Sequence, residues 1–180
     1  MFRCVWVCAV VCVASSAVLA AELPADVAAE VAKFKDANPK VRQQGLTALG
    51  EMGEKAKPAI PNILEMLNDK TTWVTTRALM VLVKVGPDES CAKPVGPFLG
   101  RGEGITTLAV DVMVALKEKS VPALIEALKD DKSAEGACDV LKQIGPAGKA
   151  AAAQLAATSK STKSAPVREA CAKALKAINK

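Results

Sequence analysis

Six cysteines are the most reactive side chains in this sequence, which contains no histidine and no tyrosine. Histidine is the commonest general base in enzymes, and it also activates the serine or cysteine nucleophile of many hydrolases. Its absence removes both kinds of nucleophile pair from consideration. No two of the cysteines are spaced as Cys-x-x-Cys, so the sequence predicts neither a zinc site nor a disulfide framework.

Carboxylates and glycines offer two other candidate sites. Asp130 and Asp131 lie at a predicted helix end between Lys129 and Lys132, and we interpret them as a solvated turn rather than a Ca²⁺ or Mg²⁺ site. The glycine-rich segment 100–104 matches neither Gly-x-Gly-x-x-Gly nor a P-loop, so we interpret it as a turn between helices. The sequence therefore predicts no catalytic residue, no cofactor site and no metal site, and the protein is not expected to be an enzyme.

The start of the chain has the features of an export signal. Arg3 supplies a positive charge, Val5–Val13 is an uncharged apolar run, and small residues precede a cut after Ala20. This pattern predicts a signal peptide at 1–20, a single repeat domain at 21–180, and a mature protein in the periplasm or outside the cell. The uncharged stretch is also about the shortest that could span a bilayer, so an uncleaved anchor is the alternative.

A repeated helical pattern dominates the rest of the sequence. Its anchoring leucines, spaced 33, 34, 25 and 34 residues apart, are Leu49, Leu82, Leu116, Leu141 and Leu175. Apolar residues recur eight and four positions before most of these leucines and three positions after, which places them on one face of a helix. The residues four positions before these leucines are mostly small, so we expect a neighbouring helix to approach closely there. A residue that tolerates a left-handed backbone, usually Gly, follows four positions after.

Most of these helices are followed by a second one that begins at a proline, such as Pro61, Pro122 or Pro146. Neither helix of such a pair can bury its apolar face alone, so the pairs are expected to stack. A capping helix is predicted at about 24–36, and the last unit, 166–180, has only the first helix of a pair.

Two units depart from this pattern. Leu116 and Pro122 are only six positions apart, so the third pair should have almost no loop. Pro94, Gly96 and Pro97 interrupt the preceding second helix, and the stack is expected to bend or loosen between residues 94 and 104.

Several of these motifs resemble HEAT-like repeats of the short bacterial, PBS-lyase-like type. Asn38-Pro39-Lys40-Val41-Arg42 is followed by Ala48-Leu49 and Met52-Gly53, and Ala165-Pro166-Val167-Arg168 repeats the opening. The resemblance covers about residues 38–180. It implies an all-α protein, a right-handed α-α superhelix of about four and a half helical hairpins.

Members of that superfamily are usually binding scaffolds, and some are enzymes. The HEAT-like hydroxylases hold two iron ions with repeated His-Glu pairs, and this sequence has no histidine to supply them. In the family, an arginine seven positions before the leucine often forms a polar ladder between repeats. Here that column contains Arg42 and Arg168 but no arginine between them, so we interpret both as structural.

The three cysteines outside the predicted signal are Cys91, Cys138 and Cys171. Cys91 follows a predicted loop and is expected to be exposed. Cys138 and Cys171 occupy neighbouring columns of successive repeats. Because packed helix axes lie about 8–10 Å apart while disulfides need Cα atoms within about 7 Å, we expect two buried thiols, with a disulfide as the alternative.

Basic residues are concentrated at the end of the chain. From residue 140 onward there are eight of them and one acid, Glu169. The candidate partner-binding residues are Lys142, Lys149, Lys160, Lys163, Lys173 and Lys176. They could dock on lipid headgroups or an acidic protein, but the favoured interpretation is a polar capping repeat that keeps the stack soluble. No nucleic-acid partner is predicted, because the mature chain has one Trp and no stacking platform.

These observations favour an exported, non-enzymatic helical-repeat scaffold that binds a protein. The groove formed by the second helices, or the interrupted central region, is the expected contact surface. Two alternatives stay open: a degenerate relative of the HEAT-like lyases and hydroxylases, and a module that docks on an anionic surface. The sequence predicts neither the identity of the partner nor the oligomeric state.

Overall fold

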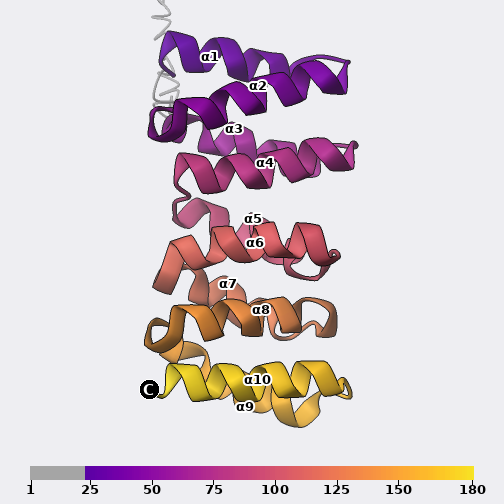
Figure 1. Cartoon of the computed structure of the whole chain (residues 1–180), viewed down its shortest axis with the longest axis vertical. Helices are drawn as coiled ribbons and strands as arrows, with labels where there is room; N and C mark the ends of the chain where they lie inside the picture. The colour runs from indigo at the N-terminus through magenta and orange to yellow at the C-terminus, as the bar shows by residue number, and fades with distance from the viewer. Residues whose placement is uncertain (1–22) are drawn as a thin grey trace, which may run out of the picture.

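Five helices of fourteen residues each form one layer of the computed structural model, which describes residues 23–180 (Figure 1). These A helices are α2 (Pro39–Met52), α4 (Thr72–Val85), α6 (Glu103–Leu116), α8 (Asp131–Ile144) and α10 (Ala165–Ile178). Shorter B helices lie behind them, namely α3 (Ile60–Glu65), α5 (Ala92–Val95), α7 (Val121–Ala127) and α9 (Ala152–Ser161). No strand occurs in this part of the chain. The predicted all-α solenoid is confirmed, with four hairpins and a final unpaired A helix.

The helix α1 (Ala25–Ala32) and the 3-10 turn η1 (Lys33–Lys35) cover the first end of the stack, as predicted for residues 24–36. The chain ends at the opposite end, after α10 (Figure 1). The predicted signal peptide lies outside the described residues. Of the helices in residues 23–180, none combines the length and the apolar character that crossing a membrane requires.

Local sequence explains where the A helices begin. The side chain of Asn38 accepts a hydrogen bond from the backbone N–H of Lys40, and Asp130 does the same for Lys132. Each caps a helix whose first N–H groups would otherwise lack a partner. Pro39 follows Asn38 directly, and a proline at the first helical position loses no hydrogen bond.

The apolar columns of successive A helices form one continuous core with the B helices. Leu49, Leu82 and Leu141 are fully buried in it. A small residue allows close packing at Gly45, as predicted. A Cβ atom there would lie 2.7 Å from the backbone oxygen of Glu30. The absence of a side chain therefore lets α1 pack directly on the backbone of α2.

The third unit is displaced from its predicted register. Since α6 ends at Leu116, the residue that takes the place of Leu49 in α2 is Met113, three positions before the predicted anchor. Met113 is fully buried. The residue after α6, Lys117, has a φ of 52°, close to the 57° of Gly53 after α2. Because a lysine occupies the position where a glycine ends α2, α4 and α8, the end of this helix was not predicted from the sequence. The sequence pattern also predicts a left-handed backbone at Asn179, four positions after Leu175, but the φ of Asn179 is −98°, so that prediction is wrong.

Replacing Lys117 by glycine is expected to raise the free energy of unfolding by about 1 kcal/mol, because a side chain is strained in the backbone region that Lys117 occupies. Urea denaturation followed by circular dichroism would measure the change. Lys119→Gly is the matched control, since Lys119 lies in the same turn without a positive φ and should gain nothing. A Lys117→Gly variant no more stable than the wild type would contradict the assignment.

The interrupted second unit is short but not loose. After the four residues of α5, the chain continues as the 3-10 turn η5 (Gly96–Gly100), in which Phe98 and Leu99 are buried. This turn packs on α8, and a Cβ atom on Gly136 would lie 2.4 Å from the backbone oxygen of Leu99. The predicted interruption is confirmed. The predicted loosening is wrong, because the glycines bring two backbones into direct contact.

Candidate interaction surface

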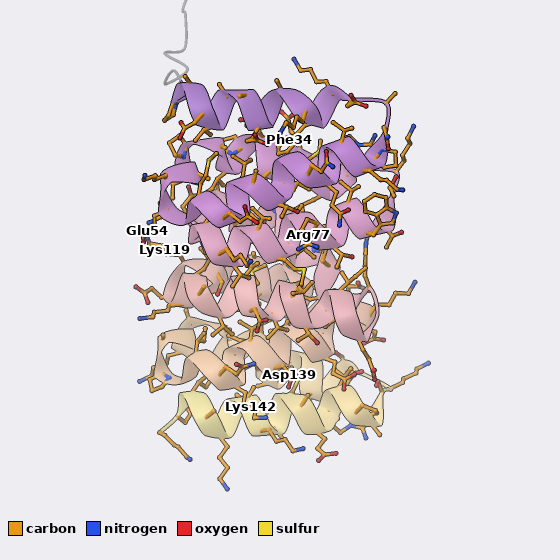
Figure 2. The ribbon with its side chains drawn as sticks, turned by 45° about the horizontal axis from the view of Figure 1, so that its top comes forward. Phe34, Glu54, Arg77, Lys119, Asp139 and Lys142 are labelled. Carbon is orange, nitrogen blue, oxygen red and sulfur yellow. The ribbon has the colours of Figure 1, made fainter. Side chains whose placement is uncertain are left out.

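The large hydrophobic side chains that are exposed in residues 23–180 all belong to α4. Trp73, Met80 and Val83 are 40%, 40% and 38% exposed. Trp73, Arg77 and Met80 follow at intervals of four and three residues, so they share one face of the helix, and Val83 lies at its edge. We call these four residues the α4 surface; Arg77 is labelled in Figure 2. Scattered apolar residues are ordinary on a protein surface, whereas a contiguous apolar patch is typical of interaction sites.

A shallow groove extends the α4 surface onto α2. It is lined by Lys40, Gln43, Gln44 and Trp73. No carboxylate lines this groove, while Lys40 within it and Arg77 on the neighbouring turn of α4 are cationic. This surface lies on A helices, whereas the sequence predicted a contact through the groove of the B helices or through the interrupted central region.

A second groove lies between α8 and α10, among the predicted lysines. Its lining includes Lys142 and Lys173, but also three acids, Glu135, Asp139 and Glu169. The Nζ atom of Lys173 lies 2.7 Å from Oε1 of Glu169. That hydrogen bond raises the pKa of Lys173 and lowers the pKa of Glu169. Asp139 and Lys142 come from the same helix (Figure 2).

The six candidate lysines are all exposed, and the structure divides them into two groups. Lys142, Lys149, Lys173 and Lys176 lie toward the carboxyl ends of α8 and α10, where the 3-10 turn η7 (Gly145–Ala151) contacts α10. Lys160 and Lys163 lie toward the opposite ends of those helices. The loop beside Lys163 is fixed there by Thr162, whose Oγ1 donates a hydrogen bond of 3.2 Å to Oδ1 of Asp131.

The lysines consequently do not form one basic patch. Glu135 and Asp139 precede residue 140, so counting charge along the end of the chain left them out. Folding places both acids beside Lys142 and Lys173 in the second groove. Surface charge here depends on which helices are neighbours, and the local excess of positive charge is smaller than the sequence suggests.

The best-defined polar contact is the buried ion pair of Arg42 and Asp69. Nε and Nη2 of Arg42 donate to the two carboxylate oxygens of Asp69 at 2.6 and 2.9 Å. Nη1 donates to the backbone oxygens of Asp36 and Ala37 at 2.9 and 3.1 Å. Both side chains are about 5% exposed. The hydrogen bond from Arg42 holds the pKa of Asp69 below its ordinary value.

This pair links the segment before α2 to the loop before α4, which confirms that Arg42 is structural. The sequence did not single out its partner, Asp69, because the two residues are 27 positions apart. In the last repeat, Nη2 of Arg168 makes the same kind of contact, donating to the backbone oxygen of Thr162 at 3.2 Å, so Arg168 is structural as well. The preceding repeat fixes the corresponding connection with hydroxyls instead. Oγ of Ser133 donates to the backbone oxygen of Ala127 at 3.2 Å, and Oγ1 of Thr158 donates to that of Leu128 at 3.0 Å. The predicted break in the arginine ladder is confirmed.

The remaining candidates for chemistry are structural. Cys91 was expected to be exposed but is fully buried, because the 3-10 turn Glu89–Cys91 turns it inward, and burial raises its pKa to about 11. Asp130 caps α8, in agreement with the predicted turn. Within residues 23–180, no three Cys, Asp or Glu side chains are grouped so that they could hold a metal ion.

Comparison with known proteins bears on the fold alone. No family model matches the sequence, and no curated protein matches it. Two solved structures of engineered proteins share the architecture, each at low sequence identity. One has a TM-score of 0.58 at 13% identity over 85% of this chain and 79% of its own. The other has a TM-score of 0.55 at 14% identity over 86% of this chain, which spans about half its length (48%).

The chain is an all-α helical-repeat solenoid. That conclusion combines the stacked hairpins of the structure with the likeness to both engineered proteins. Identities this low carry nothing about binding or catalysis, so the function must be argued from the surface of the molecule itself.

Proposed function

We propose that this protein is an exported, non-enzymatic HEAT-like scaffold that binds a partner protein through the α4 surface. The observation that carries the proposal is the exposure of Trp73 and Met80 on one helix face, with Arg77 between them. Trp, Met and Arg are the residue types most enriched at protein interfaces, and Trp and Arg dominate their binding energy.

The chemistry of the α4 surface indicates what the partner presents. The adjoining groove carries the cation Lys40 and no carboxylate, and Arg77 adds a second cation. A partner segment with carboxylates flanking an apolar side chain would match both properties. A rigid helical layer suits such binding, because few side chains need to be ordered when the complex forms.

The two alternatives have less support. Docking on an anionic surface through the lysines is weakened by Glu135, Asp139 and Glu169, which lie among them. A relationship to the HEAT-like lyases and hydroxylases would require a catalytic group, and the buried thiols and the Arg42–Asp69 pair are engaged in structural contacts. Export is inferred from the N-terminal sequence, with its apolar run and the small residues before Ala21.

Site-specific photocrosslinking in the native host tests the proposal. We expect a crosslinker in place of Met80 to give a discrete adduct with an acidic partner, and the recovered protein to begin at Ala21. A crosslinker in place of Ala153, which is exposed on α9, is the matched control and should give none.

A second variant makes the test specific. Adding Arg77→Glu to the Met80 crosslinker should abolish the adduct, because the new carboxylate repels the acidic partner. Equal adducts at the two crosslinker positions would contradict binding through α4. Adducts that survive Arg77→Glu would contradict recognition by charge.

A further inference from the structure

Cys138 and Cys171 face each other across the last two A helices. Cys138 lies on α8 and Cys171 on α10, and both are fully buried. Their Sγ atoms are 3.0 Å apart. The sequence-based estimate of helix spacing favoured two separate thiols, yet the two side chains point at one another. Neither is needed by the α4 surface, which belongs to another part of the stack.

We propose that these two thiols are oxidised to a disulfide that fastens α10 to the stack. A disulfide bond is about 2.05 Å long, so the sulfur atoms need to move about 1 Å closer. The bond would join residues that are 33 positions apart, and so would also enclose η7 and α9. The other cysteine in residues 23–180, Cys91, lies in an earlier repeat and takes no part.

The position of the bond explains its use. In a solenoid each repeat contacts only its neighbours, so the contact between two successive units is what holds them together. In residues 23–180, α10 packs chiefly on α8, α9 and η7, all of which belong to the preceding unit. A covalent bond from α10 to α8 would hold these two units together.

The reaction is a thiol–disulfide exchange with an external disulfide, such as that of an oxidoreductase or of oxidised glutathione. The thiolate of one cysteine attacks the acceptor, and a mixed disulfide forms as one acceptor thiol leaves. The thiolate of the second cysteine then displaces the other acceptor sulfur. The two protons lost by Cys138 and Cys171 end on the two acceptor thiols, and the acceptor is reduced by two electrons.

The surroundings of the pair determine when this exchange takes place. Burial, together with the contact to Cys171, holds the pKa of Cys138 well above its ordinary range. In the folded protein the thiol therefore stays protonated and no acceptor can reach it. Exchange happens while α10 is undocked, during folding.

Oxidative refolding of the full chain tests the proposal. The protein is unfolded in urea with reductant, refolded with oxidised and reduced glutathione, alkylated in denaturant and digested with trypsin. Each of the three cysteines in residues 23–180 then lies on its own peptide, and these peptides are 85–101, 133–142 and 169–173, since trypsin does not cleave between Lys93 and Pro94. We expect the second and third to be joined and the first to be alkylated, with a Tm roughly 5–15 °C above that of the reduced protein.

Two variants provide the controls. Cys91→Ala should keep the joined peptide and the Tm difference, and Cys138→Ala should lose both. Complete alkylation of Cys138 and Cys171 after oxidative refolding would overturn the proposal. So would their pairing mainly with Cys91 or with the cysteines of the N-terminal segment. The disulfide is identified from the peptides of the wild-type chain. The result therefore does not depend on whether the Cys138→Ala variant folds.

Discussion

Replacing Gly136 by alanine is expected to lower the free energy of unfolding by about 2 kcal/mol or more, although alanine is the better helix former. Gly136 lies inside α8, where its missing side chain admits the turn η5. An added Cβ atom would lie 2.4 Å from the backbone oxygen of Leu99 and 3.1 Å from its Cβ atom. A backbone oxygen cannot rotate away as a side chain can, so η5 and α8 must separate. Urea denaturation monitored by circular dichroism would measure the loss.

Gly104→Ala is the matched control for this prediction. Gly104 also lies in an A helix, α6, but a Cβ atom there would meet nothing within 4 Å. It should therefore stabilise the protein by about 0.5–1 kcal/mol through helix propensity and reduced chain entropy. If both variants shifted stability in the same direction, the close contact between η5 and α8 would not exist as described.

Replacing Asp69 by alanine is expected to lower the Tm by roughly 5–10 °C at neutral pH. The variant leaves the guanidinium of Arg42 buried without its carboxylate, and an unpaired buried charge costs more than the pair itself contributes. It also removes the acceptor for the backbone N–H of Thr71, which lies 2.8 Å from Oδ1 of Asp69. Thermal unfolding monitored by circular dichroism would measure the shift.

The difference between Asp69→Ala and the wild type should shrink in acid. The pKa of Asp69 is lowered in the folded protein, chiefly by the hydrogen bond from Arg42. A carboxyl group of this kind contributes its full stability above its unfolded pKa of about 4, and the contribution is lost as the pH falls through the folded pKa. The two proteins should therefore converge at low pH.

The control for this pair is Glu126→Gln, which breaks an exposed ion pair. Glu126 and Lys129 are 70% and 54% exposed, with 2.7 Å between their charged atoms. Exposed pairs of this kind contribute little, so the Tm should change by no more than about 2 °C. A wild-type protein and an Asp69→Ala variant with equal Tm at neutral pH would contradict a stabilising role for the buried pair.

Features that depend on neighbouring positions along the chain could be predicted. Helix periodicity, the glycines that end A helices and the prolines of the B helices act within a turn or two, and their pattern repeats. Their agreement indicated an all-α stack of four and a half hairpins. The register of the third unit was predicted wrongly for a related reason. The residue after its A helix, Lys117, is not of a type that favours a positive φ, so no local signal marked the end of the helix.

The candidate contact surface was predicted only in general terms. A binding role followed from the repeat and the missing catalytic residues, but nothing in the sequence distinguished Trp73 or Met80 from core residues. Each lies in an apolar helix, and exposure depends on which face of that helix the neighbours cover. The lysines were predicted as a group because they are close in sequence, and folding separated them and placed acids among them.

By itself, the sequence determined the helices, their pairing and their repetition, because hydrogen bonding, capping and apolar periodicity are local. Only the tertiary structure decided which residues meet between repeats: Arg42 with Asp69, Gly136 with the backbone of Leu99, and Cys138 with Cys171. Those contacts depend on the offset and rotation of one helix against the next. The offset and the rotation both result from the packing of the whole interface. A shift of one helical turn would give each of these residues a different partner.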